Sequence, residues 1–560
     1  MFLPTTKEEM KKLNWDKPDI ILVTGDTYID SSFIGSAVIG RVLTSAGYKV
    51  GIIAQPTTEN GLDITRLGEP KLFWGVTAGS LDSMVANYTA LKKRRKSDDF
   101  TPGGQNNRRP DRASIVYCNL IKKYFKKTVP IVLGGIEASL RRVAHYDYWN
   151  NKIRRSILVD AKADILIYGM GEKAVLALAE KIKKGEDYTR LRGICFLSPH
   201  PREASLMLPS YADIAKNKEK FTIMFHTFYN NNDALTAKAL SQQQDTRYLI
   251  QNPPAYPLNQ KEMDQIYNFS YENEVHPFYR KYGKVKAMDT IRFSVTTHRG
   301  CYGECNFCSI AVHQGKVIQG RSEKSILKQV ERLVESKHFK GYIFDLGGPT
   351  ANMYGIECLK KLQKGSCADK RCLYPDKCRN LNINHKKQLE ILSKARRIKG
   401  VKKIFIASGI RYDMILNDKK YGHRYLRELI GHHVSGQLKI APEHIEKRIL
   451  DKMGKPDNSY LKSFKDQFFQ INKEIGKKQF LTYYLIAAHP GCREEDMYQL
   501  KDYATKELKI NPEQVQIFTP LPSTYSALMY YTEKDPFSGE TVFVEKNLKK
   551  KNRQKDILIK

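Results

Sequence analysis

Short apolar runs alternate with segments of helical spacing through residues 1–200. The first run, "DIILVTG" at 19–25, is rich in β-branched residues and ends in glycine. The segment "SSFIGSAVIGRVLTSAG" at 31–47 then places apolar residues on one helical face. Apolar runs without polar alternation predict strands buried on both faces, so we expect an α/β domain with a Rossmann-like parallel sheet. The predicted strands lie at 19–25, 48–55, 72–77, 130–135 and 163–172.

Two segments of the first half break this pattern. Residues 91–112 are polar, with glycine, proline and basic side chains, and predict a long loop over the strand ends. Residues 201–285 lose the strand–helix rhythm and carry prolines and aromatics, as in "NPPAYPLNQ" at 252–260. We expect this second segment to be a connector between two domains.

The alternation returns over residues 286–530, where helical segments such as "EKSILKQVERLVESK" at 323–337 separate the apolar runs. Six successive strand–helix units predict a partial or full (β/α) barrel, with a site built by loops at the carboxyl ends of the strands. Residues 531–560 follow as a basic C-terminal tail. The six predicted strands lie at 291–300, 342–348, 402–411, 435–444, 480–491 and 514–522.

The composition is that of a globular protein, with 41% hydrophobic and 28% charged residues in a chain of 560. No apolar run approaches the ~20 residues of a membrane helix, and the first residues lack an apolar signal segment. We therefore expect a cytoplasmic protein with no membrane partner. Cysteines in that compartment stay reduced, so clustered cysteines indicate metal or redox ligands before disulfides.

The formal net charge is +34, from 94 lysines and arginines against 60 aspartates and glutamates. Such a field attracts polyanions, which makes nucleic acid a candidate partner. Basic runs occur at 92–96 and 107–112, but no signature of an RNA-binding module accompanies them. A generally lysine-rich chain with solvated basic loops is the alternative interpretation.

Cys301, Cys305 and Cys308 follow the first predicted strand of the second domain with the spacing C-x3-C-x2-C. A [4Fe–4S] cluster normally takes four thiolates, so three would bind three irons and leave the fourth open to a small molecule. Zinc is the alternative, because His298 or His313 could complete a tetrahedral site. The chain would then be a non-catalytic basic metal-binding protein.

This motif, with Phe307 directly before the last cysteine, resembles that of the radical S-adenosylmethionine (SAM) superfamily. "DLGGPT" at 345–350 stands in place of the superfamily's Gly-Gly-Glu element, with Pro349 instead of the glutamate. The resemblance implies that backbone carbonyls around Gly347 and Gly348 bind the SAM amino group. It also implies ribose or carboxylate contacts from later strand ends, although ordinary strand-end polar residues would look the same. The candidates for these contacts are Ser408, Arg411 and Glu443.

Longer segments resemble the YgiQ-type family of radical SAM proteins over nearly the whole chain. They include "VTGDTYID", "GGIEASLRR", "ILVDAKADILIYGMGE" and "IFTPLPSTYSALMYYT". The resemblance implies an enzyme that cleaves SAM to a 5′-deoxyadenosyl radical, with electrons from a reductant such as flavodoxin or ferredoxin. It implies no particular reaction, so catalytic residues and substrate stay unassigned.

The N-terminal α/β domain also resembles the cobalamin-binding domains that are fused to some radical SAM barrels. Those domains often carry Asp-x-His-x-x-Gly after the first strand, with the histidine as a cobalt ligand. This chain has Asp26, Thr27 and Tyr28, so tyrosine replaces the histidine. We expect the fold without cobalamin; a cobalamin-dependent radical methyltransferase that binds the cofactor without histidine is the alternative.

Four further cysteines fall in one loop-rich insertion at 358–378, "CLKKLQKGSCADKRCLYPDKC". Thiols this close in sequence could hold a second metal or an auxiliary cluster, although their spacing fits no standard signature. Reduced, unligated thiols are the alternative. The four are Cys358, Cys367, Cys372 and Cys378, whereas we expect Cys118, Cys195 and Cys492 to be core residues.

Overall fold

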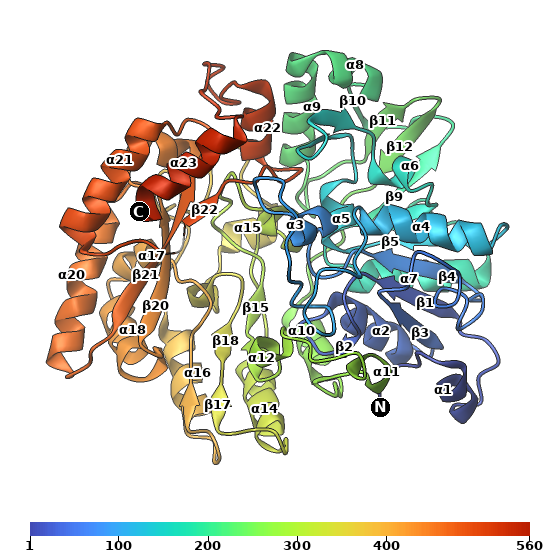
Figure 1. Cartoon of the computed structure of the whole chain (residues 1–560), viewed down its shortest axis with the longest axis horizontal. Helices are drawn as coiled ribbons and strands as arrows, with labels where there is room; N and C mark the ends of the chain where they lie inside the picture. Colours follow the sequence, from blue (N-terminus) through green and yellow to red (C-terminus); the bar gives the residue numbers. More distant parts are fainter. Residues whose placement is uncertain (514, 560) are drawn as a thin grey trace. The chain divides into compact units, whose positions relative to one another are not determined.

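A computed structural model describes residues 1–513 and 515–559. Gln514, which opens the last predicted strand, and Lys560 lie outside the described residues. The chain divides into two compact units, coloured mainly blue to green and green to red along the sequence (Figure 1). The first comprises Met1–Pro257 with Phe269–Arg292, and the second comprises Leu258–Asn268 with Phe293–Lys560.

The first unit is built on a nine-stranded sheet in the order β10-β11-β12-β9-β8-β5-β4-β1-β3. Its β3-β1-β4-β5-β8 portion is parallel, as the apolar runs predict, and every residue of β1 and β3 is buried. Helices α2 (Gly35–Ser45) and α7 (Glu172–Lys184) pack together beside it. These five strands are β1 (Ile20–Thr24), β3 (Val50–Ala54), β4 (Phe73–Thr77), β5 (Ile131–Leu133) and β8 (Ile165–Ile167).

The segment expected to be a connector instead contributes strands to this sheet. Its strands are β10 (Leu206–Leu208), β11 (Leu240–Gln244) and β12 (Arg247–Gln251). β12 pairs antiparallel with β11 and with β9 (Ile194–Ser198), which precedes the segment and is itself antiparallel to β8, and β10 pairs parallel with β11. The sheet is therefore mixed and extends beyond residue 200. β11 carries buried glutamines instead of an apolar run: Gln242 Oε1 accepts from Ala144 N–H at 3.0 Å, and Gln244 Oε1 from Ser156 N–H at 3.1 Å. Apolar periodicity could not reveal such a strand.

The second unit has the strand succession of a (β/α) barrel. Parallel pairing joins β14 to β18, β17 to β19, and β20 to β21 and then β22; a parallel bridge joins Ile410 to Ile440. The strands are β14 (Ser294–Thr296), β17 (Tyr342–Ile343), β18 (Asp345–Gly347), β19 (Lys403–Ile404), β20 (Gln437–Glu443), β21 (Phe480–Ala487) and β22 (Val515–Ile517). The principal helices are α14 (Glu323–Val334), α16 (Lys386–Arg396), α18 (Gly422–Glu428), α20 (Ser459–Glu474) and α21 (Glu494–Tyr503).

The predicted basic tail ends in a folded helix, α23 (Leu548–Ile559), which packs against α21 and β22. Gln554 Oε1 accepts a hydrogen bond from Ala488 N–H at 2.9 Å, and Lys551 Nζ donates to the Tyr530 hydroxyl at 2.8 Å. Both side chains are buried, so specific polar contacts hold a segment that composition alone would leave in solvent. None of the helices in the described ranges combines the length and the apolar character needed to cross a membrane.

Candidate functional site

The three motif cysteines lie on the loop that follows β14 and β15 (His298–Arg299) in the second unit. A methyl group placed on Gly303 would lie 3.3 Å from Cys301 Sγ and 3.6 Å from Cys305 Sγ, so both thiols flank this glycine. Gly303 N–H also points at Cys301 Sγ, at 3.3 Å. Backbone N–H groups that face sulfur are typical of loops that hold iron–sulfur clusters.

Cys308 completes the group. Burial raises the pKa of its thiol to about 12, and the nearby Cys305, Cys301 and Glu443 add to the effect. Glu443 ends β20, where the register shifts and its own backbone turns to a φ of 70°. Burial raises the pKa of this carboxyl too, against the opposing charge of Lys455. Glu443 therefore lies where β20 becomes irregular, within electrostatic reach of Cys308, and its Oε1 lies 3.7 Å from Lys455 Nζ.

Arg411 links the later strand ends to the same loop. Its Nη1 lies 3.8 Å from Cys305 Sγ, while Nε and Nη2 donate to the two Asp413 oxygens at 2.9 and 2.5 Å. Burial opposes the charged form, but Asp413 first of all, with the nearby Cys305 and Cys301, outweighs it and raises the pKa of Arg411. Asn352 fixes the backbone, since it accepts from Arg411 N–H and donates to Arg411 O. A fixed cation thus faces the sulfur atoms.

The Gly-Gly element at the end of β18 lies against a buried histidine. Any side chain on Gly348 would collide with the His298 ring, at 2.5 Å from Cε1, so only glycine fits there. Burial lowers the pKa of His298 to about 4, which keeps the ring neutral. The carbonyl of Gly347 accepts from Thr297 N–H at 2.7 Å, and Thr350 Oγ1 lies 3.6 Å from Cys301 Sγ. The element therefore runs beside the thiol loop.

Ser408, a predicted SAM contact, is held by a carboxylate. Its hydroxyl donates to Asp345 Oδ2, and the N–H groups of Ala407 and Ser408 donate to Asp345 Oδ1 at 2.8 and 3.1 Å. Burial raises the pKa of Asp345 despite these bonds. Asp345 therefore joins β18 to the segment that follows β19, a role that the sequence "DLGG" did not indicate.

Two cations that sequence reasoning missed reach Glu304, which lies between Cys301 and Cys305. Lys361 Nζ lies 2.9 Å from Glu304 Oε1, and Lys316 Nζ lies 3.0 Å from Oε2. Burial alone would raise the pKa of this carboxyl, but the two ammonium groups lower it to about 2. Glu304 also has a φ of 47°, so the ion pairs fix an unusual backbone conformation in the loop. The sequence feature that could have indicated these ion pairs is the glutamate between two cysteines of the motif.

The cysteine-rich insertion supplies one of these cations. Lys361 lies on α15 (Leu359–Lys364), and Arg371 of the same insertion donates to the Glu304 carbonyl at 3.0 Å and to Asn306 Oδ1 at 2.7 Å. The insertion thus supports the motif loop through the Lys361–Glu304 ion pair and through the hydrogen bonds of Arg371.

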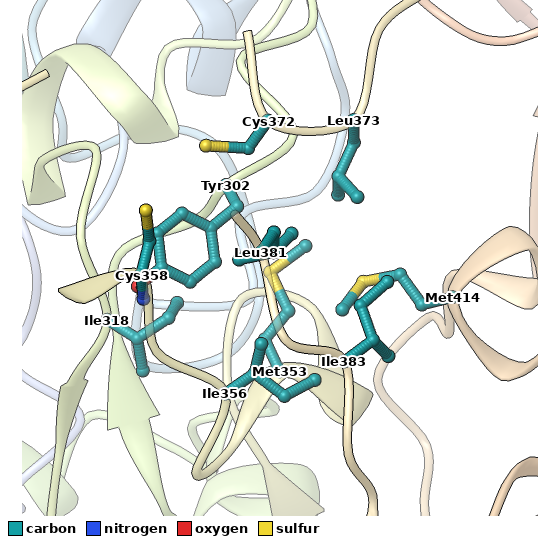
Figure 2. Close-up of a cluster of buried hydrophobic side chains, with 10 residues drawn as sticks. All are labelled: Tyr302, Ile318, Met353, Ile356, Cys358, Cys372, Leu373, Leu381, Ile383 and Met414. Carbon is teal, nitrogen blue, oxygen red and sulfur yellow. The ribbon is translucent and has the colours of Figure 1, made fainter. Parts of the chain in front are cut away.

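Three of the four insertion cysteines lie in or against one apolar cluster. Cys358 and Cys372 are buried in an apolar cluster around Tyr302 (Figure 2). Cys378 and Cys301 are partly buried and pack against this cluster. Cys367 is half-buried outside that cluster. Across residues 1–513 and 515–559, no three or more His, Cys, Asp or Glu side chains are placed to hold a metal ion. Cys118, Cys195 and Cys492 are buried, as expected of core residues.

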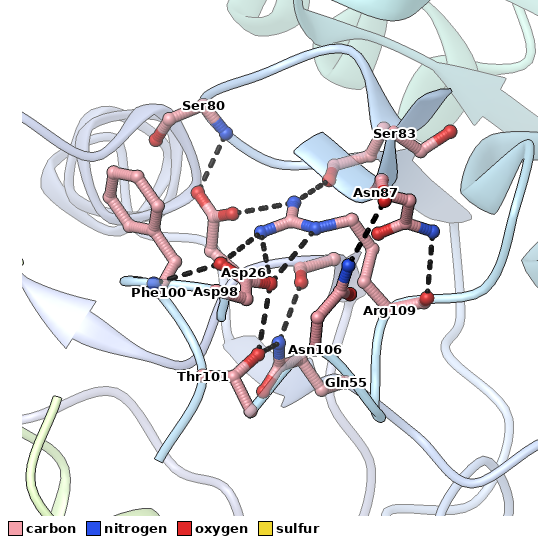
Figure 3. Close-up of polar contacts among 12 residues, drawn as sticks. Asp26, Gln55, Ser80, Ser83, Asn87, Asp98, Phe100, Thr101, Asn106 and Arg109 are labelled. Atoms are coloured by element: carbon pink, nitrogen blue, oxygen red, sulfur yellow. Dashed lines mark hydrogen bonds and ion pairs between the residues drawn. The ribbon is translucent and has the colours of Figure 1, made fainter. Parts of the chain in front are cut away.

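The first unit has its own strand-end feature. β1 lies between β3 and β4, so the chain reverses its direction of travel across the sheet there, the point where α/β sheets bind ligands. Arg109, from the predicted long loop, fills this place: Nη1 lies 2.8 Å from Asp26 Oδ1 and 2.7 Å from the Ala78 carbonyl, and Nη2 lies 3.0 Å from Asp98 Oδ2 (Figure 3). Arg109 and both carboxylates are buried.

Tyr28, which replaces the cobalt-ligating histidine, is also fully buried. Its hydroxyl accepts from Leu3 N–H at 3.0 Å, and its ring stacks on His276 with the centroids 5.4 Å apart. The phenol is thus occupied by contacts within the first unit.

Comparison with known proteins identifies the family. The family model described as Radical SAM N-terminal matches residues 2–294. A UPF0313 protein of Fusobacterium nucleatum is 60% identical over 558 residues, which span 100% of this chain and 98% of that protein. The chain belongs to the YgiQ-type UPF0313 family of radical SAM proteins. A UPF0313 relative from Thermotoga petrophila is 50% identical over 561 residues, spanning 99% of this chain and 98% of the relative.

Solved structures share the fold of this UPF0313 protein. The radical SAM methyltransferase TsrM of Kitasatospora setae, solved with cobalamin and a [4Fe–4S] cluster bound, has a TM-score of 0.52 at 13% identity. The match covers 91% of this chain and 76% of TsrM. The cobalamin-dependent radical SAM enzyme OxsB, solved with aqua-cobalamin, has a TM-score of 0.51 at 12% identity, covering 94% of this chain and 57% of OxsB. These likenesses confirm the predicted α/β architecture.

Proposed function

We propose that this UPF0313 protein is a radical SAM enzyme in which Cys301, Cys305 and Cys308 bind a [4Fe–4S] cluster with one iron open to SAM. The observation that carries the proposal is the meeting of the three thiols with Arg411 and Glu443 at the strand ends. When bound, the cluster supplies the electron that cleaves SAM to methionine and the 5′-deoxyadenosyl radical, which takes a hydrogen atom from the substrate.

The neighbouring residues suit this task. Arg411, held rigidly by Asp413, places a positive charge beside the sulfurs, where it offsets the negative charge of a thiolate-ligated cluster. The glycine pair lets the backbone approach within contact of His298. Gly347 O already accepts from Thr297 N–H, so the remaining acceptor capacity of the two carbonyls would serve the SAM amino group. The His298 ring is neutral, so it adds no positive charge that would repel the sulfonium group of bound SAM.

An anaerobic reconstitution tests the proposal. Iron and sulfide are counted per chain after loading, and 5′-deoxyadenosine is measured from SAM with dithionite as reductant. We expect cleavage by the native chain, none after Cys301→Ala, and unchanged cleavage in Cys195→Ala, which removes a buried thiol of the first unit. One zinc per chain, no iron and no cleavage would instead identify a non-catalytic zinc protein.

For the substrate class, the net charge of +34 favours a polyanion, and we propose RNA. Binding that weakens steeply between about 50 and 200 mM salt, together with RNA-dependent 5′-deoxyadenosine formation, would support this. SAM cleavage that RNA does not change, with stimulation by peptides or small molecules, would contradict it.

Cobalamin is the alternative that the fold of TsrM and OxsB raises. The residues of this chain do not fit it in the strand-end position. Arg109 with Asp26 and Asp98 fills the place between β1 and β4, and Tyr28 is turned into the interior. We therefore infer that the first unit does not take cobalamin there. Absorbance of cobalamin that stays with the native protein through gel filtration would contradict this inference.

A further inference from the structure

We propose that Cys358, Cys367, Cys372 and Cys378 bind a second iron–sulfur cluster, all of whose irons are ligated by cysteine. This goes beyond the proposed SAM chemistry, because four thiolates leave no iron open to a substrate. Such a cluster would store or carry an electron, or brace the fold, and would not bind SAM.

The first line of support is the backbone that carries these cysteines. From Gly365 to His385, between α15 and α16, the chain forms neither helix nor strand. Irregular segments longer than about 12–15 residues are uncommon inside compact domains and need something to hold them. Cysteines at intervals along such a segment provide ligands for a metal centre that does so.

The second line of support is where the sulfurs point. Cys358 N–H donates to the Tyr302 hydroxyl at 3.2 Å, which places Cys358 beside the motif loop. Cys378 N–H donates to the Cys372 carbonyl at 2.9 Å, which brings these two cysteines together. The sulfurs of Cys358 and Cys372 extend into the space beside the Tyr302 ring (Figure 2). The two thiols are close enough to interact electrostatically.

The surroundings suit a negatively charged, water-shielded centre. Lys361 hydrogen-bonds to Cys372 as well as to Glu304, so a buried ammonium group is at hand to balance thiolate charge. The apolar residues of the cluster surround the buried Cys358 and Cys372, and an apolar shell of this kind limits solvent access to a metal centre. They are Ile318, Met353, Ile356, Leu373, Leu381, Ile383 and Met414.

The test removes the first site and asks whether iron remains. The variant Cys301→Ala/Cys305→Ala/Cys308→Ala is reconstituted anaerobically, and iron, acid-labile sulfide and the paramagnetic resonance of the dithionite-reduced protein are measured. We expect about four irons and four sulfides per chain. Adding Cys358→Ser and Cys372→Ser should remove them, whereas adding Cys118→Ala and Cys195→Ala, two buried thiols of the first unit, should not.

The outcomes separate this proposal from the proposed function. A folded triple variant, judged by circular dichroism and thermal unfolding, that holds no iron or one zinc would overturn the second cluster. Absence of SAM cleavage in the native chain would overturn the radical enzyme but leave this iron count unaffected. Cys358→Ser/Cys372→Ser in the native background should lower iron from about eight to about four while the triplet stays loaded.

Discussion

Lys361 Nζ lies 2.9 Å from Glu304 Oε1, and both side chains are almost fully buried. Glu304 stands between two of the predicted cluster ligands, whereas Lys361 belongs to the cysteine-rich insertion. The pair therefore ties the state of the insertion to the shape of the motif loop. A buried pair of this kind specifies geometry more than it adds stability, because desolvation offsets most of the attraction.

Removal of one partner should be costly. Glu304→Gln leaves Lys361 and Lys316 without their carboxylate, and we expect the free energy of unfolding to fall by about 3–5 kcal/mol. Iron retention by the motif loop should fall with it. Chemical unfolding and iron content check this, with Lys386→Met as the control because the ion pair of Lys386 with Glu390 is exposed. An unchanged unfolding curve for Glu304→Gln would show that the pair is not formed.

Arg411 should matter for chemistry more than for folding. Arg411→Lys keeps the charge but loses the two-pronged contact with Asp413, so the cation no longer stays beside Cys305. We expect a loss of about 10–100-fold in 5′-deoxyadenosine formation with normal iron content. The matched control is Arg427→Lys, whose exposed partner is Glu474. Equal loss in both variants would contradict a role at the thiols.

Asp418 should make stability depend on pH at the acid end. Burial opposes ionisation, but hydrogen bonds from His385 and from backbone N–H groups lower the pKa of Asp418 to about 2. Its contribution is therefore fully present above about pH 4, near the unfolded-state pKa, and is lost as the pH falls toward 2. Asp418→Asn should be about 2 kcal/mol less stable at pH 6, and the gap should close near pH 2. A gap that stays constant over this range would contradict the pairing.

The ion pairs of Arg109 with Asp26 and Asp98 in the first unit leave no room for a side chain at Gly79. Gly79 has a φ of 105°, and a methyl group there would collide with the Asp26 carboxylate and lie 2.8 Å from Arg109 Nη1. Gly79→Ala should unfold well before Gly47→Ala, a position in the same unit with a φ of 87° and open space around it. The control shares the backbone strain of about 1–3 kcal/mol, so the difference isolates the collision. Equal midpoints in urea would show that the clamp yields readily.

The apolar runs predicted the core strands of both units because a buried parallel strand needs a continuous apolar sequence. They located β1, β3, β4, β5 and β8, and the strands of the barrel. They missed β11, whose buried glutamines bond to backbone groups far along the chain, and they gave no sign that α23 is packed. The pattern of apolar residues shows which face of an element is buried. It does not show which buried polar side chain has a hydrogen-bond partner.

The sequence by itself determined the spacing of Cys301, Cys305 and Cys308 and the family to which the chain belongs, because ligand spacing and family motifs are local. Only the tertiary structure decided that Arg411 faces Cys305, that Lys361 reaches Glu304 and that Arg109 fills the strand ends of the first unit. Each of these contacts joins residues distant in sequence, and its strength depends on burial. No local pattern shows whether a charge is buried. An arginine or lysine looks the same in the sequence whether its side chain is solvated or held by buried carboxylates.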